Sequence, residues 1–131
     1  DRAGRVVVVR AEGKLGNLEK KLALLPKTTT AGIGHTRWAT HGRPSEENAH
    51  PHSSGPIVLL HNGIIENYVP LKRMLTEQGF EFLSETDTEV AAHLLHLEYR
   101  SLDPSRDPVE RMRTALLRLT GQLKGAYAFA I

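Results

Sequence analysis

Apolar side chains recur at helical spacing in four stretches of the chain. The predicted helices cover residues 17–25, 68–78 and 86–99, and a fourth helix starts at residue 108. Suitable N-caps stand at the starts of the first three helices, in Asn17, Asn67 and Thr86, and Asp107-Pro108 opens the last. Thr86 and Glu89 have the spacing of a capping box, in which each residue satisfies a free N–H of the other. On the fourth helix one apolar face is expected, formed by Val109, Met112, Leu116 and Leu119.

Shorter runs rich in apolar and β-branched residues predict five strands, at residues 5–10, 31–37, 57–60, 80–82 and 125–131. Residues 1–4 are expected to form the turn of a hairpin whose first strand lies upstream, and Pro26 to end the first helix. Residues 39–54 show little periodicity and predict a long ordered loop, a kind of segment that often carries function. Because strands and helices do not alternate strictly, the pattern predicts an α+β fold.

Asn62-Gly63 follows the apolar run at residues 57–60 and admits two interpretations. Asn-Gly is a strong turn signal, because both residues tolerate positive φ, so the pair could simply reverse the chain. The residues that follow, however, favour the start of a helix rather than a second strand. At the end of a strand, an Asn amide and a Gly N–H can point into one space and stabilise an oxyanion in acyl transfer.

Composition removes several classes of function. The chain of 131 residues has 17 basic and 15 acidic residues and a net charge of +2, without a basic block, so nucleic-acid binding is not predicted. No apolar run is long enough to span a membrane. With no cysteine in the chain, a disulfide, a cysteine-ligated zinc site and a cysteine nucleophile are all excluded from these residues.

Arg37 and Asp87 are charged residues at the ends of predicted elements, and each has a structural and a functional interpretation. A guanidinium matches a carboxylate through two parallel hydrogen bonds, but a lone arginine is more often a surface residue or part of an ion pair. Asp87 lies in the first turn of a predicted helix, where the helix dipole stabilises a carboxylate without any ligand. Two histidine pairs, His50 with His52 and His93 with His96, are too weak a pattern to predict a metal site.

Four motifs in one order resemble the glutaminase domain of class II glutamine amidotransferases. They are the stretches at residues 34–42, 48–52, 61–67 and 84–90, and the resemblance extends over essentially the whole chain. It implies an N-terminal-nucleophile hydrolase fold, a four-layer α/β/β/α sandwich with antiparallel sheets, incomplete here at both ends. Residues 1–131 are then expected to be part of a glutaminase domain, without its N-terminal nucleophile segment and without the sugar-isomerase domains that follow.

The resemblance also implies a role for particular residues. Arg37 matches the arginine that binds the α-carboxylate of glutamine, with Thr40 and His41 helping to hold that group. Asp87 matches the residue that binds the α-ammonium, and Asn62 and Gly63 match the oxyanion hole, where Gly63 also contacts substrate. Trp38 is expected to pack beside the site, and His50 to shape the loop over it. No metal and no cofactor are implied.

Within this family the chain is most similar to members that transfer glutamine-derived ammonia to fructose 6-phosphate, forming glucosamine 6-phosphate and glutamate. The partners implied are L-glutamine and fructose 6-phosphate, with a cytoplasmic homodimer as the complete enzyme and no nucleic acid or membrane. These residues alone are expected to be inactive, because the family's nucleophile is an N-terminal cysteine. Two alternatives remain: a class II amidotransferase with another acceptor, and a catalytically silent amino-acid-binding module.

Overall fold

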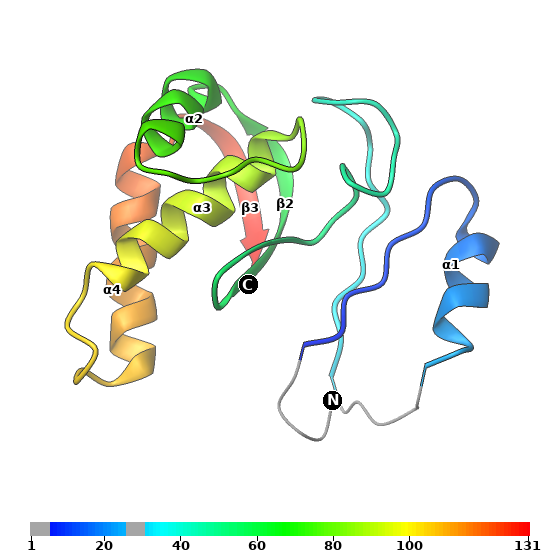
Figure 1. Ribbon diagram of the computed structural model, residues 1–131, viewed down its shortest axis with the longest axis horizontal. Helices are drawn as coiled ribbons and strands as arrows, with labels where there is room; N and C mark the ends of the chain where they lie inside the picture. The colour runs from blue at the N-terminus through cyan, green and yellow to red at the C-terminus, as the bar shows by residue number, and fades with distance from the viewer. Residues whose placement is uncertain (1–5, 26–30) are drawn as a thin grey trace.

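The computed structural model describes residues 6–25 and 31–131 as a mixed fold of helices and antiparallel strands (Figure 1). The predicted α+β class is therefore confirmed. In chain order the elements are α1 (Leu15–Leu22), β1 (His52–Ser54), β2 (Ile57–Ile65), α2 (Tyr68–Glu77), α3 (Asp87–Arg100), α4 (Pro108–Gln122) and β3 (Gly125–Ala130). Figure 1 shows α2, α3 and α4 gathered around β2 and β3, with α1 well apart from them.

The strands form one antiparallel sheet in the order β1-β2-β3, with β2 in the middle. β1 pairs only with the beginning of β2, where His52 lies opposite Leu59 and Ser54 opposite Ile57. β3 pairs with the other end, from Leu60 opposite Ala130 to Ile65 opposite Gly125. The pairing of β1 with β2 therefore ends at Leu59, and β1 does not cover the rest of β2. The described residues contain this one sheet, so the four-layer sandwich stays a prediction.

Helix α3 forms the centre of the core, because it contacts β1, β2, α2 and α4. Its first nine residues are all buried. The largest fully buried apolar side chains come from the sheet and from α2, α3 and α4: Ile57, Leu59, Ile65, Leu75, Val90, Leu94, Leu95 and Leu119. Burial of such side chains stabilises a fold by roughly 1.5–3 kcal/mol each, which explains why α3 is held firmly. No helix in the described ranges combines the length and apolarity needed to cross a bilayer.

Capping residues predicted the starts of α3 and α4 correctly. Thr86 Oγ1 accepts a hydrogen bond from Glu89 N at 3.2 Å, and Asp107 Oδ1 accepts from Val109 N and Glu110 N at 3.0 and 3.1 Å. The predicted ends at residues 78 and 99 are each one residue from the observed ends. Two details were wrong. Glu89 turns toward the Leu83 and Ser84 N–H groups, and Val109 lies 73% exposed on the outer face of α4.

Two asparagines predicted as caps make other contacts. Helix α1 begins at Leu15, with Lys14 at its N-cap, and Asn17 instead donates from Nδ2 to Glu12 O at 3.0 Å. No residue of α1 is buried, so its leucine spacing does not correspond to a core face. Asn67 does precede α2, but its amide bridges the α4–β3 connection, donating to Gln122 O and accepting from Lys124 N at 2.8 Å each.

Three of the predicted strands are absent from the described residues. Residues 6–10, 31–37 and 80–82 form no ladder, because a β-rich sequence becomes a strand only beside a partner strand. Val6 and Ile33 are 69% and 57% exposed, whereas Phe80 and Phe82 pack against His93 at the core edge. The loop predicted at residues 39–54 is irregular except for β1 at its end. The turn expected at residues 1–4 and the stop at Pro26 lie outside the described residues.

A chain of buried polar groups joins β1 to the start of α3. His52 Nε2 lies 3.1 Å from Thr86 Oγ1, which lies 3.0 Å from Ser84 Oγ, and Ser84 Oγ donates to Glu89 Oε2 at 2.7 Å. Burial lowers the pKa of His52 to about 4, although the Glu89 carboxylate opposes the shift. Burial alone would raise the pKa of Glu89, but contact with His93 and hydrogen bonds from Leu83 and Ser84 lower it to about 2. At neutral pH His52 is therefore neutral and Glu89 is ionised.

These pKa shifts predict that acid destabilises the fold in two steps. Unfolded His52 gains a proton near pH 6.5 and the folded residue only near pH 4, so the free energy of unfolding falls as the pH drops through that window. Glu89 lowers the free energy of unfolding further as the pH falls from 4.5 toward 2. Urea unfolding at a series of pH values measures both steps.

His52→Gln supplies the control, since glutamine can bond Thr86 but does not titrate. Its unfolding free energy should vary less steeply with pH between 6.5 and 4 than that of the parent, with His50 still contributing. An unchanged slope in that window would show that His52 is not the titrating group.

Candidate functional site

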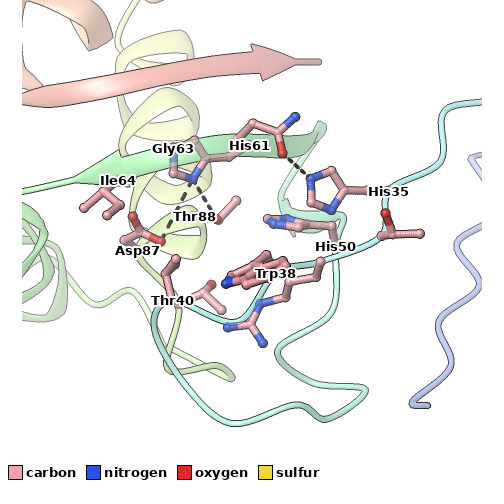
Figure 2. Close-up of a pocket in the computed structure, with 13 residues that line it drawn as sticks. His35, Trp38, Thr40, His50, His61, Gly63, Ile64, Asp87 and Thr88 are labelled. Carbon is pink, nitrogen blue, oxygen red and sulfur yellow. Dashed lines mark hydrogen bonds and ion pairs between the residues drawn. The ribbon is translucent and has the colours of Figure 1, made fainter. Parts of the chain in front are cut away.

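A pocket of about 330 Å³ lies where the middle of β2 meets the start of α3 and the 35–40 loop (Figure 2). Four separate parts of the chain line it. The lining residues are His35, Thr36, Arg37, Trp38, Thr40, His50, His61, Asn62, Gly63, Ile64, Thr86, Asp87 and Thr88. Every residue singled out from the sequence for a site role is among them except His41. The structure thus brings together motifs that lie up to about fifty residues apart.

Asn62 and Gly63 lie inside β2 rather than in a turn. The strand continues to Ile65, so the turn interpretation is wrong, and so is the expectation that the strand ends at residue 60. Gly63 has φ +123°, which side-chain-bearing residues rarely adopt, and a Cβ there would come within 2.1 Å of Ala126 O. Glycine is therefore required by the close approach of β3, a constraint that short-range sequence patterns do not reveal.

The register of β2 against β3 shows where the Gly63 N–H points. Glu66 N donates to Lys124 O at 2.9 Å, and in an antiparallel ladder such bonded pairs alternate with non-bonded ones. Positions 62 and 64 of β2 therefore bond β3, whereas Gly63 and Ile65 turn their N–H groups to the opposite edge. Ile65 N indeed donates there to Asp87 Oδ2 at 2.9 Å. Since β1 does not reach this part of the edge, the Gly63 N–H faces the pocket.

Asp87 is the first residue of α3, and its side chain is 4% exposed. One carboxylate oxygen, Oδ2, accepts the bond from Ile65 N and fixes the end of β2 to the start of the helix. The other oxygen, Oδ1, lies 3.7 Å from His41 Nδ1 and 4.0 Å from His61 Nδ1, both beyond hydrogen-bond distance. Among the described residues Oδ1 has no hydrogen-bond donor, so half of this carboxylate is available to a cation in the pocket.

Arg37 lines the pocket and also organises the loop that follows it. Its guanidinium donates to the backbone carbonyls of His41, Gly42 and Arg43, the last two at 3.2 Å each. A guanidinium has five N–H groups, so at least two remain for another partner. Thr40 lines the same wall. Trp38 also lines the pocket, but it is 89% exposed, so it stands at the rim rather than packing beside the site as expected.

His41 does not line the pocket and instead contacts two of its walls. Its ring meets Tyr68 edge-on, with centroids 4.7 Å apart, and its Nδ1 approaches Asp87 from the side. Its backbone carbonyl accepts from Arg37. The structure therefore puts His41 in contact with both charged residues and outside the pocket lining, a position suited to holding them.

His35 and His61 line the pocket and make contacts that the sequence did not predict. His35 Nε2 lies 2.6 Å from Asn62 Oδ1, and His61 Nδ1 lies 3.0 Å from Thr88 Oγ1 beneath the pocket. His35 and His61 belong to stretches that the sequence singles out, but nothing in a sequence shows a contact between side chains 27 residues apart. Burial lowers the pKa of His61, with His35 and His41 adding to the shift and Asp87 opposing it.

His50 lies between the 35–40 loop and β1. Its ring meets His35 edge-on at a centroid distance of 4.2 Å and His52 at 5.4 Å. Burial, reinforced by the neighbouring histidines and Arg37, lowers its pKa to about 3, so it is neutral at physiological pH. Asn48, fully buried, fixes the rest of the loop by accepting from Glu85 N at 2.9 Å and donating to Arg43 O at 3.0 Å.

The pocket thus has an anionic wall at Asp87, a cationic wall at Arg37 and hydrogen-bond donors along β2. Opposite charges held apart suit a zwitterion, and adjacent donors suit an oxygen that gains negative charge.

Comparison with known proteins gives a consistent result. The sequence model of the glutamine amidotransferase domain matches residues 35–131. Glutamine--fructose-6-phosphate aminotransferase [isomerizing] of Brucella abortus biovar 1 is 53% identical over 97% of this chain and 20% of that protein. The protein of the same name from Rhizobium meliloti is 53% identical over 98% of this chain and 20% of its own length, and that of Mycobacterium bovis is 48% identical over 97% and 21%.

Among solved structures, glutamine phosphoribosylpyrophosphate amidotransferase from B. subtilis, complexed with ADP and GMP, matches with a TM-score of 0.50 and 34% identity. The match covers 72% of this chain and 19% of that one. The present chain spans about a fifth of the length of the curated relatives it matches. From the residues matched and from these identities, the chain belongs to the glutamine amidotransferase domain family.

Proposed function

We propose that this chain is the glutamine-hydrolysing part of an amidotransferase that passes ammonia to fructose 6-phosphate. The observation that carries the proposal is the register of β2 against β3, which leaves the N–H of pocket-lining Gly63 outside the ladder. Two donors next to one another on β2 can hold the oxygen of a glutamine side-chain amide while that oxygen becomes negative. Asn62 and Gly63 are then the oxyanion hole.

The two charged walls would bind the other end of glutamine. Asp87 Oδ1, with no donor among the described residues, receives the α-ammonium, and the remaining N–H groups of Arg37 receive the α-carboxylate. Thr40 lies beside Arg37 in the pocket lining. His41 supports both contacts, since its ring lies near Asp87 and its carbonyl accepts from Arg37. Trp38 at the rim and His50 beside His35 complete the lining of the site.

The reaction needs a nucleophile from elsewhere in the complete protein, since these residues include no cysteine. A thiolate would add to the side-chain carbonyl of glutamine, and the oxyanion hole would stabilise the tetrahedral intermediate. The amide nitrogen then takes a proton and leaves as ammonia, giving a thioester. Water cleaves the thioester to glutamate and regenerates the thiol, so glutamine and water become glutamate and ammonia.

The proposal extends to the complete protein. We assign residues 1–131 to part of a glutaminase domain with the four-layer sandwich, joined in the complete protein to sugar-isomerase domains that use fructose 6-phosphate. The support is that relatives 48–53% identical to this chain carry the name glutamine--fructose-6-phosphate aminotransferase and are about five times as long. A cytoplasmic homodimer is part of the same proposal.

Substitution of Asn62 tests the oxyanion hole. In the complete protein, Asn62→Ala should lower kcat for glutamine hydrolysis by about 10²–10³, because a donor used only in the transition state is lost. The KM for glutamine should change little, since the ground-state amide binds this donor weakly. Steady-state ammonia release measures both constants. A raised KM with an unchanged kcat would remove Asn62 from the oxyanion hole.

Substitution of Asp87 tests recognition of the amino-acid end. Asp87→Asn keeps a side-chain oxygen for Ile65 N but removes the charge, so the fold should persist. Its kcat/KM for glutamine should fall tenfold or more, since a decade corresponds to about 1.4 kcal/mol and a buried charge pair is worth roughly 2–5 kcal/mol.

A glutamine analogue without its α-amino group is the matched control. The parent protein should process it poorly, and Asp87→Asn should add little further loss. Arg37→Ala should also lower kcat/KM for glutamine. It should lower the stability of the fold more than Asp87→Asn does, because three loop carbonyls lose their donor. Normal glutamine kinetics in Asp87→Asn would mean that Asp87 only joins β2 to α3. A protein that binds glutamine but releases no ammonia, even with its full sequence, would instead support the silent binding module.

A further inference from the structure

We propose that His35 is a positioning residue, which binds the carbonyl end of the Asn62 side-chain amide and so reserves its NH₂ end for the oxyanion. This inference rests on the proposed function, because it concerns how the oxyanion hole is oriented. His35 Nε2 lies 2.6 Å from Asn62 Oδ1, a short contact between the 35–40 loop and the exposed middle of β2 (Figure 2).

An asparagine side chain can serve an oxyanion in only one of its two orientations. The amide has a carbonyl end that accepts and an NH₂ end that donates, and the two ends have nearly the same shape. With the NH₂ end in the pocket, the carbonyl end lies against His35 and needs a donor. His35 provides that donor when Nε2 carries the hydrogen. In the reverse orientation the pocket would contain a carbonyl oxygen, which repels an oxyanion.

The tautomer of His35 favours the productive orientation. Its other nitrogen, Nδ1, is buried and has no hydrogen-bond partner among the described residues. If Asn62 were reversed and donated to Nε2, the hydrogen would move to Nδ1 and become an orphaned buried donor. Buried N–H groups without a partner are rarer in proteins than under-satisfied acceptors. The hydrogen on Nε2, and hence Oδ1 of Asn62 facing His35, is the better arrangement.

The ring of His35 is itself held from behind. His50 meets it edge-on at 4.2 Å, and His50 in turn meets His52, which is hydrogen-bonded to Thr86 at the start of α3. Because burial lowers the pKa of His50 to about 3, this neighbour carries no charge at neutral pH and does not repel His35. The row of rings therefore connects Asn62 to the helix that carries Asp87. This connection fixes the two ends of the proposed glutamine site relative to each other.

A double-mutant cycle in the complete protein tests the inference. His35→Leu should lower kcat for ammonia release by about 10- to 100-fold, a usual result of a misplaced catalytic group, with KM for glutamine nearly unchanged. In the Asn62→Ala background the same change should cost less than about threefold, because residues that act through one another are not additive. A purely structural role would lower kcat equally in both backgrounds.

Two polar variants keep the test valid if His35→Leu does not fold. His35→Gln places an amide N–H near the position of Nε2 and should recover most of the rate, whereas the shorter His35→Asn cannot reach Asn62 and should stay slow. Thermal melting should be similar for the two. Equal rates for the two polar variants, or full additivity in the cycle, would overturn the positioning role. If Asn62→Ala by itself left kcat unchanged, the oxyanion hole would fail and with it the proposed function, which separates the two failures.

Discussion

The register of β2 against β3 is the constraint on which the site depends. It places the backbone bonds to β3 at positions 62, 64 and 66 and leaves the N–H groups of Gly63 and Ile65 on the other edge. Ile65 uses its N–H to bind Asp87, and Gly63 leaves its own facing the pocket. A shift by one residue would exchange these two sets of N–H groups, so one strand pairing determines both the anchor and the free donor.

The charged walls follow from the way α3 is fixed. Thr86 caps the helix, Asn48 ties the preceding loop to residue 85, and buried Glu89 binds the N–H groups of residues 83 and 84. Asp87 is consequently held at the first turn, where the helix dipole favours its charge. Arg37 lines the same pocket from a loop whose carbonyls it binds itself. Preorganised charges of this kind need little rearrangement when a zwitterion enters.

Local signals predicted the elements that local interactions determine. Thr86 and Asp107-Pro108 indicated the starts of α3 and α4, because capping acts over three or four residues. The strands expected at residues 5–10, 31–37 and 80–82 are missing from the described residues, since pairing depends on distant partners. Asn62-Gly63 was ambiguous for the same reason: the approach of Ala126 requires the glycine. Motif order identified the pocket residues, but the contact of His35 with Asn62 appears only in the fold.

The most direct test is a crystal structure of the complete protein with glutamine bound and its nucleophile inactivated. The central claim is that β2 presents the Gly63 N–H and the Asn62 amide to one oxygen. The account predicts the side-chain oxygen of glutamine about 2.7–3.1 Å from both Gly63 N and Asn62 Nδ2, with the α-ammonium on Asp87 Oδ1. A structure in which Gly63 N bonds another strand, or in which glutamine lies with its α-carboxylate over β2, would contradict it.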